Sequence, residues 1–525
     1  MSASSHPKES RPSVESVTAE NALLREENQH LKDRIAWFER QVFGSKSEKR
    51  LIDNPQQVSL LTEPTETPTE SGAKSKVSGY ERGKGRKQRP DDCATDSGLR
   101  FGDDVPVVVI PVMVPELTGP EADQYEVIDT KVTFKLAQRG APYVVLRYEI
   151  PIIKRKDSQA VKTAAMPDQV LEHSIADVSL LAGLLVDKFQ FHLPLHRQHQ
   201  RMAQMGITVA RSSLTNWVKR AIELLRPIVD EQCQHILLSK VLAMDETPIK
   251  AGRQSKGKLK QGYFWPLYGE EDEVVFTYSD SRGRRHIEQV LKSQFTGTLI
   301  TDGYAAYSRY AETTQGITHA QCWVHSRRYF INAQERNPKA SAEAIEQIGQ
   351  LYQVEKAIRS NHLSGDKKQQ YRLEHSKPIV DKLFDWCRQQ CHRTDLTPTH
   401  PLSKALKYVM ARENQLRVFL EDPDVPLDTN HLEREIRPIP LGRKNWLFCW
   451  TELGAEHVGI IQSLISTCKL HDINPYTYLV DVLQRISSHP ANKIKELTPR
   501  LWKDQFADDP MRSPLDHIKE ISDAD

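Results

Sequence analysis

Residues 241–249, VLAMDETPI, place four consecutive apolar side chains directly before two carboxylates, Asp245 and Glu246. A short apolar run bounded by turn-forming residues is typical of a strand that is buried on both faces. An ionised carboxylate at the end of such a strand is costly unless a partner offsets its charge. The stretch therefore predicts a central strand that delivers Asp245 to a functional site.

The same arrangement recurs at residues 296–304, TGTLITDGY, where the apolar run ends at Asp302. Taken singly, Asp302 before glycine is an ordinary turn residue, and Asp245 before Thr-Pro could cap a bend. Paired on neighbouring strands, the two carboxylates would form a site for a divalent cation. Acidic groups without thiolates favour Mg²⁺ or Mn²⁺. Two such ions can activate an attacking oxygen and stabilise a leaving one.

The segments around these acids alternate between strand-like and helix-like patterns. Several short strands follow Leu238, a helix is expected near residues 284–293, and the polar helical stretch 337–425 resembles an insertion. Successive strands, then a helix and further strands, fit an α/β sheet of the ribonuclease H type. We expect a core in two parts, 237–336 and 426–486, followed by a tail at 487–525.

A third acid, Glu433, lies in residues 427–439, LDTNHLEREIRPI, which predict a helix. Helical spacing puts Asn430, Glu433, Arg434 and Arg437 on adjoining faces. One carboxylate could then face a metal while two guanidiniums contact phosphate. A glutamate beside an arginine is equally an ordinary feature of a solvated helix.

The N-terminal part predicts an association element followed by a tether. Residues 1–50 carry a heptad with apolar seam positions such as Leu24 and Leu31, which favours a short parallel coiled coil, the alternative being an amphipathic helix docked on its own domain. Residues 51–95 are rich in Pro, Ser and Thr, which predicts a linker. Its basic half could contact DNA phosphate or simply be solvated. The cations expected to contact DNA are Arg82, Lys84, Arg86 and Lys87.

Two further modules are expected before the core. Residues 96–165 contain β-branched runs with a period of two, which predict a small β-rich module, and 166–236 predict helices. A turn at Gly206 between two of these helices resembles a helix-turn-helix, with a plain helical hairpin as the alternative. In the first case the DNA contacts would be Arg211, Asn216 and Lys219.

The bulk composition limits the classes of protein to consider. A net charge of +2 gives no global positive field, so any affinity for nucleic acid must be local. Seven scattered cysteines without paired spacing indicate reduced thiols. No signal peptide or membrane span is evident. We therefore expect a soluble, cytoplasmic, multidomain α+β protein.

Several ordered motifs sharpen these expectations. They are FGSKSEKR at 43–50, FHLPLHRQ at 191–198, MDETPIK at 244–250, TDGYAAY at 301–307, CWVHSRRYF at 322–330 and NHLEREIRPIPLGRKNWLF at 430–448. In these the chain resembles the insertion-sequence 66 family of bacterial DDE transposases across nearly its whole length. The resemblance implies a catalytic triad of Asp245, Asp302 and Glu433 on a ribonuclease H-like core. It also implies metal-dependent DNA cleavage and strand transfer at the nucleoid, and helper proteins from the same element.

The family motifs also suggest supporting residues. His325 could hydrogen-bond near the scissile phosphate or simply begin a helix, and Asn430 could support the site. Arg327 and Arg328 are plausible phosphate contacts. The expected clamp for a DNA end is Arg443, Lys444 and Trp446, with the tryptophan stacked on a displaced base, although a core tryptophan is the alternative.

Relatives commonly carry a four-cysteine zinc module after the basic linker, whereas only Cys93 is present there. We expect no zinc site in that region.

Two rival functions share parts of this pattern. A ribonuclease H-like nuclease would use the same acids but would release the cut product without joining it. A non-catalytic DNA-binding regulator would use only the coiled coil and the helix-turn-helix, and it would give no reason for the three acids.

Overall fold

The computed structural model describes residues 99–102, 105–138, 143–157, 161–164, 166–167, 169–255, 258–291, 294–446, 449 and 451–516. The predicted coiled coil and basic linker, with Arg82, Lys84, Arg86 and Lys87, lie outside these residues. The chain divides into two compact units. Every helix and strand given below belongs to the unit Leu60–Leu171 with Ile175–Asp525. The other unit is Met1–Ser59 with Glu172–Ser174, of which only the last three residues are described.

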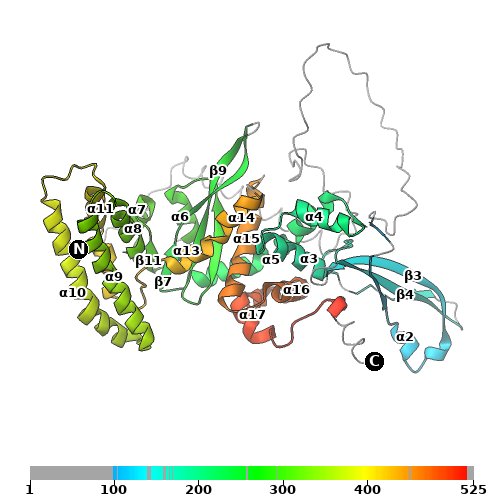
Figure 1. The fold of residues 1–525 in the computed structure, drawn as a ribbon. Coiled ribbons are helices and arrows are strands. Elements are labelled where there is room, and N and C mark those ends of the chain that lie inside the picture. The colour runs from blue at the N-terminus through cyan, green and yellow to red at the C-terminus, as the bar shows by residue number, and fades with distance from the viewer. Residues whose placement is uncertain are drawn as a thin grey trace, which may run out of the picture. The chain divides into compact units, whose positions relative to one another are not determined.

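A mixed sheet lies at the centre of this unit (Figure 1). Within the described residues its strand order is β10-β9-β7-β11-β12, and β8 pairs with β9. The strands are β7 Val241–Met244, β8 Thr247–Ser255, β9 Lys258–Tyr268, β10 Val274–Ser279, β11 Gly297–Thr301 and β12 Ile317–Gln321. β7, β9 and β10 are antiparallel neighbours, whereas β11 runs parallel to both β7 and β12. All four residues of β7 are buried, as expected for a strand covered on both faces.

Helices follow the strands and cover the sheet. They are α6 Arg284–Leu291, α7 Ala305–Thr313, α8 Trp323–Ala333, α13 Asn430–Ile436, α14 Pro438–Trp446, α15 Glu452–Leu470, α16 Pro475–Arg485, η4 Ala491–Leu497 and α17 Pro499–Phe506. Helix α15 packs directly on β10. This close approach requires Gly459, where a Cβ would lie 2.4 Å from the carbonyl oxygen of Phe276. Among the described residues, no helix has both the length and the apolar character to span a bilayer.

Between β12 and α13 the chain is helical, as the pattern at 337–425 predicts. The elements are α9 Pro338–Ser360, α10 Gly365–Cys391, α11 Pro401–Met410, α12 Glu413–Arg417 and η3 Val418–Leu420. Helix α8 of the sheet region packs on α9 and α11. Inside this group the fully buried Arg372 bonds both carboxylate oxygens of Glu355, at 2.8 and 2.9 Å. Its guanidinium also donates to the carbonyl oxygens of Phe419 and Val425, which ties α10 to the chain that returns to the sheet.

The residues before β7 form strands and then helices. The strands are β1 Arg100–Phe101, β2 Val107–Pro111, β3 Tyr125–Gln138, β4 Tyr143–Arg155, β5 Val161–Thr163 and β6 Ile207–Thr208, and the helices are α2 Pro115–Thr118, η2 Ala122–Gln124, α3 Val178–Phe189, α4 Leu195–Gln204 and α5 Arg211–Ile236. Gly206 adopts φ 75° between α4 and α5, a left-handed conformation that favours glycine. The expected turn between two helices is therefore present, with the short strand β6 inside it.

Candidate active site

Asp245 and Asp302 lie side by side because the strands before them are parallel and in register. Ala243 of β7 pairs with Ile300 of β11, and each aspartate stands two residues beyond its paired position. Oδ1 of Asp245 accepts a 2.7 Å hydrogen bond from the backbone N–H of Glu246. Oδ1 of Asp302 accepts a 2.8 Å bond from the N–H of Tyr304. These backbone bonds orient the two carboxylates.

Glu246 joins the two aspartates. One oxygen atom from each of Asp245, Glu246 and Asp302 lies within 4.8 Å of the others, a spacing that could hold a metal ion. Neighbouring residues of a regular strand point to opposite faces. The chain leaves strand geometry at residues 245–246, between β7 and β8, so both side chains can reach the same side.

Two neighbouring side chains hold Glu246 in place. The Nε of Arg282 donates to Oε1 of Glu246 at 2.7 Å, and the phenol of Tyr307 donates to Oε2 at 2.7 Å. Arg282 also lies 4.1 Å over the ring of Tyr304, whose hydroxyl donates to the carbonyl oxygen of Arg282 at 2.7 Å. Both oxygens of Glu246 are thus engaged with protein groups, whereas those of the aspartates remain more available to a ligand.

The electrostatics of the group favour an added cation. Burial, together with the negative charges of Glu246, Asp302 and Glu433, raises the pKa of Asp245 to about 8. Burial also raises the pKa of Glu246, against the lowering effect of its bonds from Tyr307 and Arg282. The raised pKa values reflect burial and repulsion between negative charges, and a bound divalent cation would offset that repulsion.

Glu433 lies near this group but outside the 4.8 Å cluster. Its Oε1 is 3.6 Å from Nε2 of His325, and its Oε2 is 3.6 Å from a guanidinium nitrogen of Arg328, both on α8. Burial lowers the pKa of His325, which the negative charges of Asp302 and Glu433 partly oppose. Oε1 of Glu433 is buried without a hydrogen bond among the described residues. That oxygen is therefore available to a ligand.

Backbone contacts hold α13 against the start of α8. The N–H of Trp323 donates to the carbonyl oxygen of Leu427 at 3.1 Å, and the N–H of Thr429 contacts Sγ of Cys322 at 3.4 Å. The N–H of Cys322 in turn bonds the carbonyl oxygen of Thr301, the residue before Asp302. This chain of contacts brings Glu433, 131 positions after Asp302 in the sequence, to the end of β11.

The other predicted site residues form contacts of their own or are exposed to solvent. Asn430 donates through Nδ2 to Asp428 at 2.7 Å. Arg443 donates to the carbonyl oxygen of Pro248, beside the acidic group, and Trp446 is half-buried against the core. The predicted cations of α8, α13 and α14 are half-buried or exposed: Arg327, Arg328, Arg434, Arg437 and Lys444.

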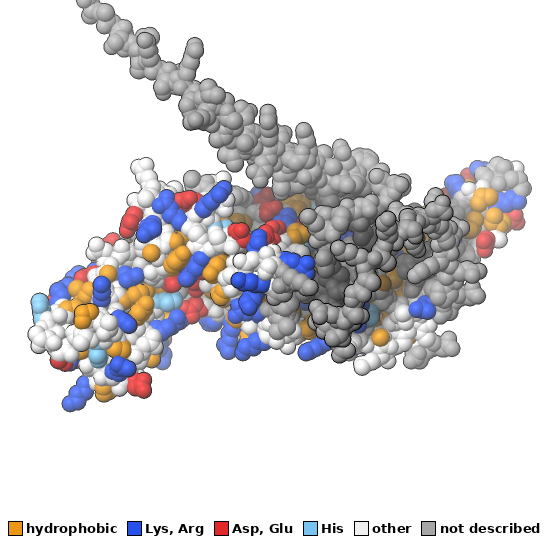
Figure 2. All heavy atoms as spheres, turned by 90° about the horizontal axis from the view of Figure 1, so that it is seen from above, with side chains coloured by type: hydrophobic (Ala, Val, Ile, Leu, Met, Phe, Trp, Pro, Cys, Tyr) orange, Lys and Arg blue, Asp and Glu red, His pale blue; other side chains and the backbone are white. Residues whose placement is uncertain are grey.

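Arg211, Asn216 and Lys219 lie in the first half of α5 and are exposed or half-buried. Figure 2 shows one face of the molecule, on which the coloured Lys and Arg side chains are interspersed with Asp and Glu. This mixture agrees with the net charge of +2.

The residues that sequence reasoning missed are Glu246 as a member of the cluster and its partners Arg282 and Tyr307. The alternation of a strand argues against Glu246 facing the same side as Asp245. Arg282 sits in a loop outside the motifs, and Tyr307 ends the motif TDGYAAY, which assigned it no role. The only signal available was the unusual pair of adjacent carboxylates at 245 and 246.

Comparison with known proteins gives three family matches. Residues 173–457 match the family described as "Transposase IS66 family", and residues 463–500 match the "IS66 C-terminal element". Residues 30–93 match the family described as "Transposase C of IS166 homeodomain". The match from 173 to 457 spans more than half of the chain and includes all four acids discussed above.

Three relatives come from Sinorhizobium fredii and are named only as uncharacterized proteins. The protein y4hP is 30% identical over 371 residues, covering 66% of this chain and 66% of the relative. The protein y4jD is 31% identical over 365 residues, covering 66% of this chain and 70% of the relative. The protein y4qI is 25% identical over 520 residues, covering 93% of both.

These matches place the molecule among transposases, and its structure adds an acidic candidate metal site. The chain belongs to the IS66 transposase family.

Proposed function

We propose that the chain is a DDE transposase that cleaves DNA at the ends of an insertion sequence and joins them to target DNA. Its catalytic acids would be Asp245, Asp302 and Glu433. The observation that carries the proposal is the register of β7 and β11, which sets two half-buried aspartates side by side at the ends of parallel strands. Enzymes of the ribonuclease H type would cleave a phosphodiester with two bound cations, and such a pair of carboxylates is needed to hold them.

The sheet supports a ribonuclease H-like core in two parts, 237–336 and 426–486. Three antiparallel strands, β10, β9 and β7, are followed in the sheet by two parallel ones, β11 and β12. The helical insertion 337–425 separates this part of the chain from the helix that carries Glu433. A fold with this order delivers its acids to one edge of the sheet from distant parts of the sequence.

The residues fit Mg²⁺ or Mn²⁺. The donor set consists of oxygen atoms alone, and burial together with the neighbouring negative charges raises the pKa of Asp245, a cost that a bound cation would offset. Asp245 and Asp302 would hold the ion, and Oε1 of Glu433, which accepts no hydrogen bond from the described residues, would complete the set. When bound, divalent ions lower the pKa of a water nucleophile and stabilise the charge of the leaving oxygen. Glu246, held by Arg282 and Tyr307, would act mainly as a positioning residue.

The chemistry would consist of two in-line displacements without a covalent enzyme intermediate. In the first, water attacks phosphorus at the element's end and the bond to the 3′ oxygen breaks, which frees a 3′-hydroxyl. In the second, that 3′ oxygen bonds to a phosphorus of the target strand, whose own 3′ oxygen leaves. Arg328 would stabilise charge on the phosphate oxygens. His325, neutral because its pKa is lowered, could accept a hydrogen bond at the site.

Other parts of the chain would bind DNA and assemble the complex. Helices α4 and α5, with the turn at Gly206, would form a helix-turn-helix-like module at 166–236 that presents Arg211, Asn216 and Lys219. The β-rich module 96–165, the basic linker 51–95 and the coiled coil 1–50 would add contacts and self-association. Arg443, Lys444 and Trp446 would contact the DNA end beside the acids, and accessory proteins of the same element would complete the assembly.

The test uses purified full-length chain, Mg²⁺, and a DNA fragment carrying both ends of the element that encodes it, with a supercoiled plasmid as target. The proposal expects end cleavage and joined products. Asp245→Asn and Asp302→Asn should abolish both while end binding persists, because each removes a metal ligand and little volume. Asp504→Asn, an exposed aspartate of α17, is the matched control and should retain activity.

The outcomes separate the proposal from its rivals. Cleavage without joined products would identify a nuclease. DNA binding without cleavage, insensitive to Asp302→Asn, would identify a non-catalytic regulator. Strand transfer by Asp245→Asn at the level of the unmodified chain would overturn the assignment of the acids.

A further inference from the structure

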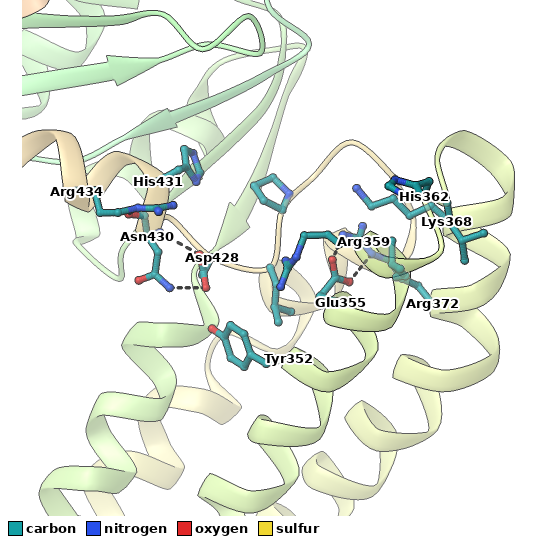
Figure 3. Close-up of a pocket in the computed structure, with 14 residues that line it drawn as sticks. Tyr352, Glu355, Arg359, His362, Lys368, Arg372, Asp428, Asn430, His431 and Arg434 are labelled. Carbon is teal, nitrogen blue, oxygen red and sulfur yellow. Dashed lines mark hydrogen bonds and ion pairs between the residues drawn. The ribbon is translucent and has the colours of Figure 1, made fainter. Parts of the chain in front are cut away.

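A cleft of about 900 Å³ opens between the helical insertion and the segment that leads into α13 (Figure 3). Arg359, His362, Lys368 and Arg372 lie on the insertion side of the cleft. On the opposite side lie His431 and Arg434. The cleft is thus lined from two sides by cationic and histidine side chains that come from separate parts of the sequence.

The acidic residues that line the cleft already have hydrogen-bond partners. Glu355 is paired with Arg372 through both carboxylate oxygens. The carboxylate of Asp428 accepts bonds from the backbone N–H and the side-chain amide of Asn430, at 3.0 and 2.7 Å. Neither carboxylate is free to pair with the remaining cations of the cleft.

Three cations of the cleft lack a carboxylate partner. Within the described part of the chain, Arg359, Lys368 and Arg434 form no ion pair, and Arg434 only donates to the carbonyl oxygen of Asn430 at 3.3 Å. Lys368 is half-buried, and burial together with the positive charge of Arg372 lowers its pKa. Positive charge held this close together, with its acids engaged elsewhere, is typical of a site for a polyanion.

The cleft begins beside the catalytic acids. Glu433 faces His325 and Arg328 of α8, and the next residue, Arg434, lines the cleft. Consecutive Cα atoms are about 3.8 Å apart. A nucleotide step along one strand of a duplex is about 3.4 Å. A strand whose phosphate sits at Glu433 therefore lies within about one or two nucleotide steps of Arg434, on the wall of the cleft that Arg359 and Lys368 also line.

We propose that this cleft binds the phosphodiester backbone of the DNA strand that leaves the acidic cluster, with Arg359, Lys368 and Arg434 as its phosphate contacts. The inference rests on the proposed function, because it takes the acids as the place of cleavage. It gives the helical insertion a role in holding DNA, which sequence patterns did not assign to it. Arg372 has a structural role. Its buried contacts with Glu355 and with the carbonyl oxygen of Phe419 fix the shape of the cleft.

The experiment measures the binding of full-length chain to a labelled 30-nucleotide single strand and its duplex by fluorescence anisotropy over a series of salt concentrations, without divalent metal. The test variant carries two substitutions, Arg359→Gln and Lys368→Gln. Each lost phosphate contact lowers the slope of log affinity against log salt by about 0.9 for duplex and about 0.7 for a single strand. We expect a slope lower by about 1.4–1.8 and, at low salt, an affinity weaker by about tenfold or more.

Two controls keep the outcome interpretable. Lys382→Gln removes an exposed cation of α10 outside the cleft and should leave the slope unchanged. Arg359→Lys with Lys368→Arg keeps both charges and should retain binding. An unchanged slope in the double glutamine variant, with circular dichroism and Tm like those of the unmodified chain, would overturn the proposal.

Failure of the cleft and failure of the proposed function give different results. If the acids do not cleave DNA, the Asp245→Asn chain and the unmodified chain both remain inactive, while the salt slope still reports on the cleft. If the cleft does not bind DNA, cleavage by the unmodified chain persists, and the slope of log affinity against log salt is the same in the double glutamine variant as in the unmodified chain.

Discussion

Oε2 of Glu246 accepts a 2.7 Å hydrogen bond from the hydroxyl of the fully buried Tyr307. Arg282 bonds the other oxygen, so the carboxylate next to Asp245 is held by protein groups from the loop after β10 and from α7. The acidic cluster therefore contains two kinds of carboxylate. Asp245 and Asp302 are available to a cation, and Glu246 links the cluster to the helices that surround it.

The first prediction concerns metal binding. Mg²⁺ or Mn²⁺ should raise the Tm of the unmodified chain, because a ligand at one hundred times its Kd stabilises the native state by about 2.7 kcal/mol. For a domain of about 150–250 residues, the size of the proposed two-part core, that corresponds to about 5–10 °C. Asp245→Asn and Asp302→Asn should lose the shift in a thermal melt, and Asp504→Asn should keep it. Equal shifts in all four proteins would indicate that the ion binds elsewhere.

The second prediction concerns pH. Because the pKa of Asp245 is raised to about 8, its carboxyl holds a proton at neutral pH that competes with the metal. The Kd for Mn²⁺, measured by titration calorimetry, should fall by up to about tenfold per pH unit as the pH rises towards 8, and then level off. A Kd that is constant between about pH 6 and 8 would contradict the assigned ligand.

The same raised pKa affects the stability of the metal-free protein. A carboxyl whose pKa is higher in the folded than in the unfolded state makes the folded state less stable as pH rises between the two values. The pKa of Asp245 is about 8 in the folded state, and its ordinary value is 3.8. The loss of folding stability is therefore greatest above pH 8. Asp245→Asn should therefore raise the Tm of the metal-free chain at that pH. A lower Tm for this variant would contradict the repulsion inferred at the cluster.

The third acid has its own test. Glu433→Gln keeps the size of the side chain but removes the charge beside His325 and Arg328. We expect strand cleavage to fall by about a thousandfold, as for loss of a group that acts on the reacting centre. Metal binding at Asp245 and Asp302 should weaken less. Glu335→Gln, at an exposed glutamate two residues beyond the end of α8, is the control, and equal activity in both variants would remove Glu433 from the site.

Loss of the hydrogen bond between Tyr307 and Glu246 should lower the stability of the protein. Tyr307→Phe leaves one oxygen of a buried carboxylate unpaired, which costs about 1–3 kcal/mol of stability. Cleavage should fall as well, with the affinity for Mn²⁺ largely retained, because Glu246 positions the cluster and is not its main ligand. Tyr310→Phe, on the same helix, does not touch the acids and serves as the control. If both variants behave alike in urea unfolding and in cleavage, the hydrogen bond has no special role.

The sequence predicted the strands that carry the two aspartates because both apolar runs are short, buried and followed by turn residues. It also predicted a helix within residues 427–439, which the structure places at Asn430–Ile436, and mostly helical structure at 337–425. It did not predict that Glu246 faces the same side as Asp245, because the break in strand geometry at 245–246 depends on the pairing of β8 with β9. The cationic cleft was also not predicted, because its two walls are far apart in the sequence. They are joined by tertiary contacts such as the hydrogen bonds from Arg372 to the carbonyl oxygens of Phe419 and Val425.

Diffraction from crystals of the full-length chain soaked in Mn²⁺, with anomalous maps at the manganese edge, would test the central claim most directly. The predicted result is a peak between the carboxylates of Asp245 and Asp302, within reach of Glu433, that is lost in crystals of Asp245→Asn. A chain that binds Mn²⁺ only at other residues, or that leaves these carboxylates without a peak while cleaving DNA, would contradict it.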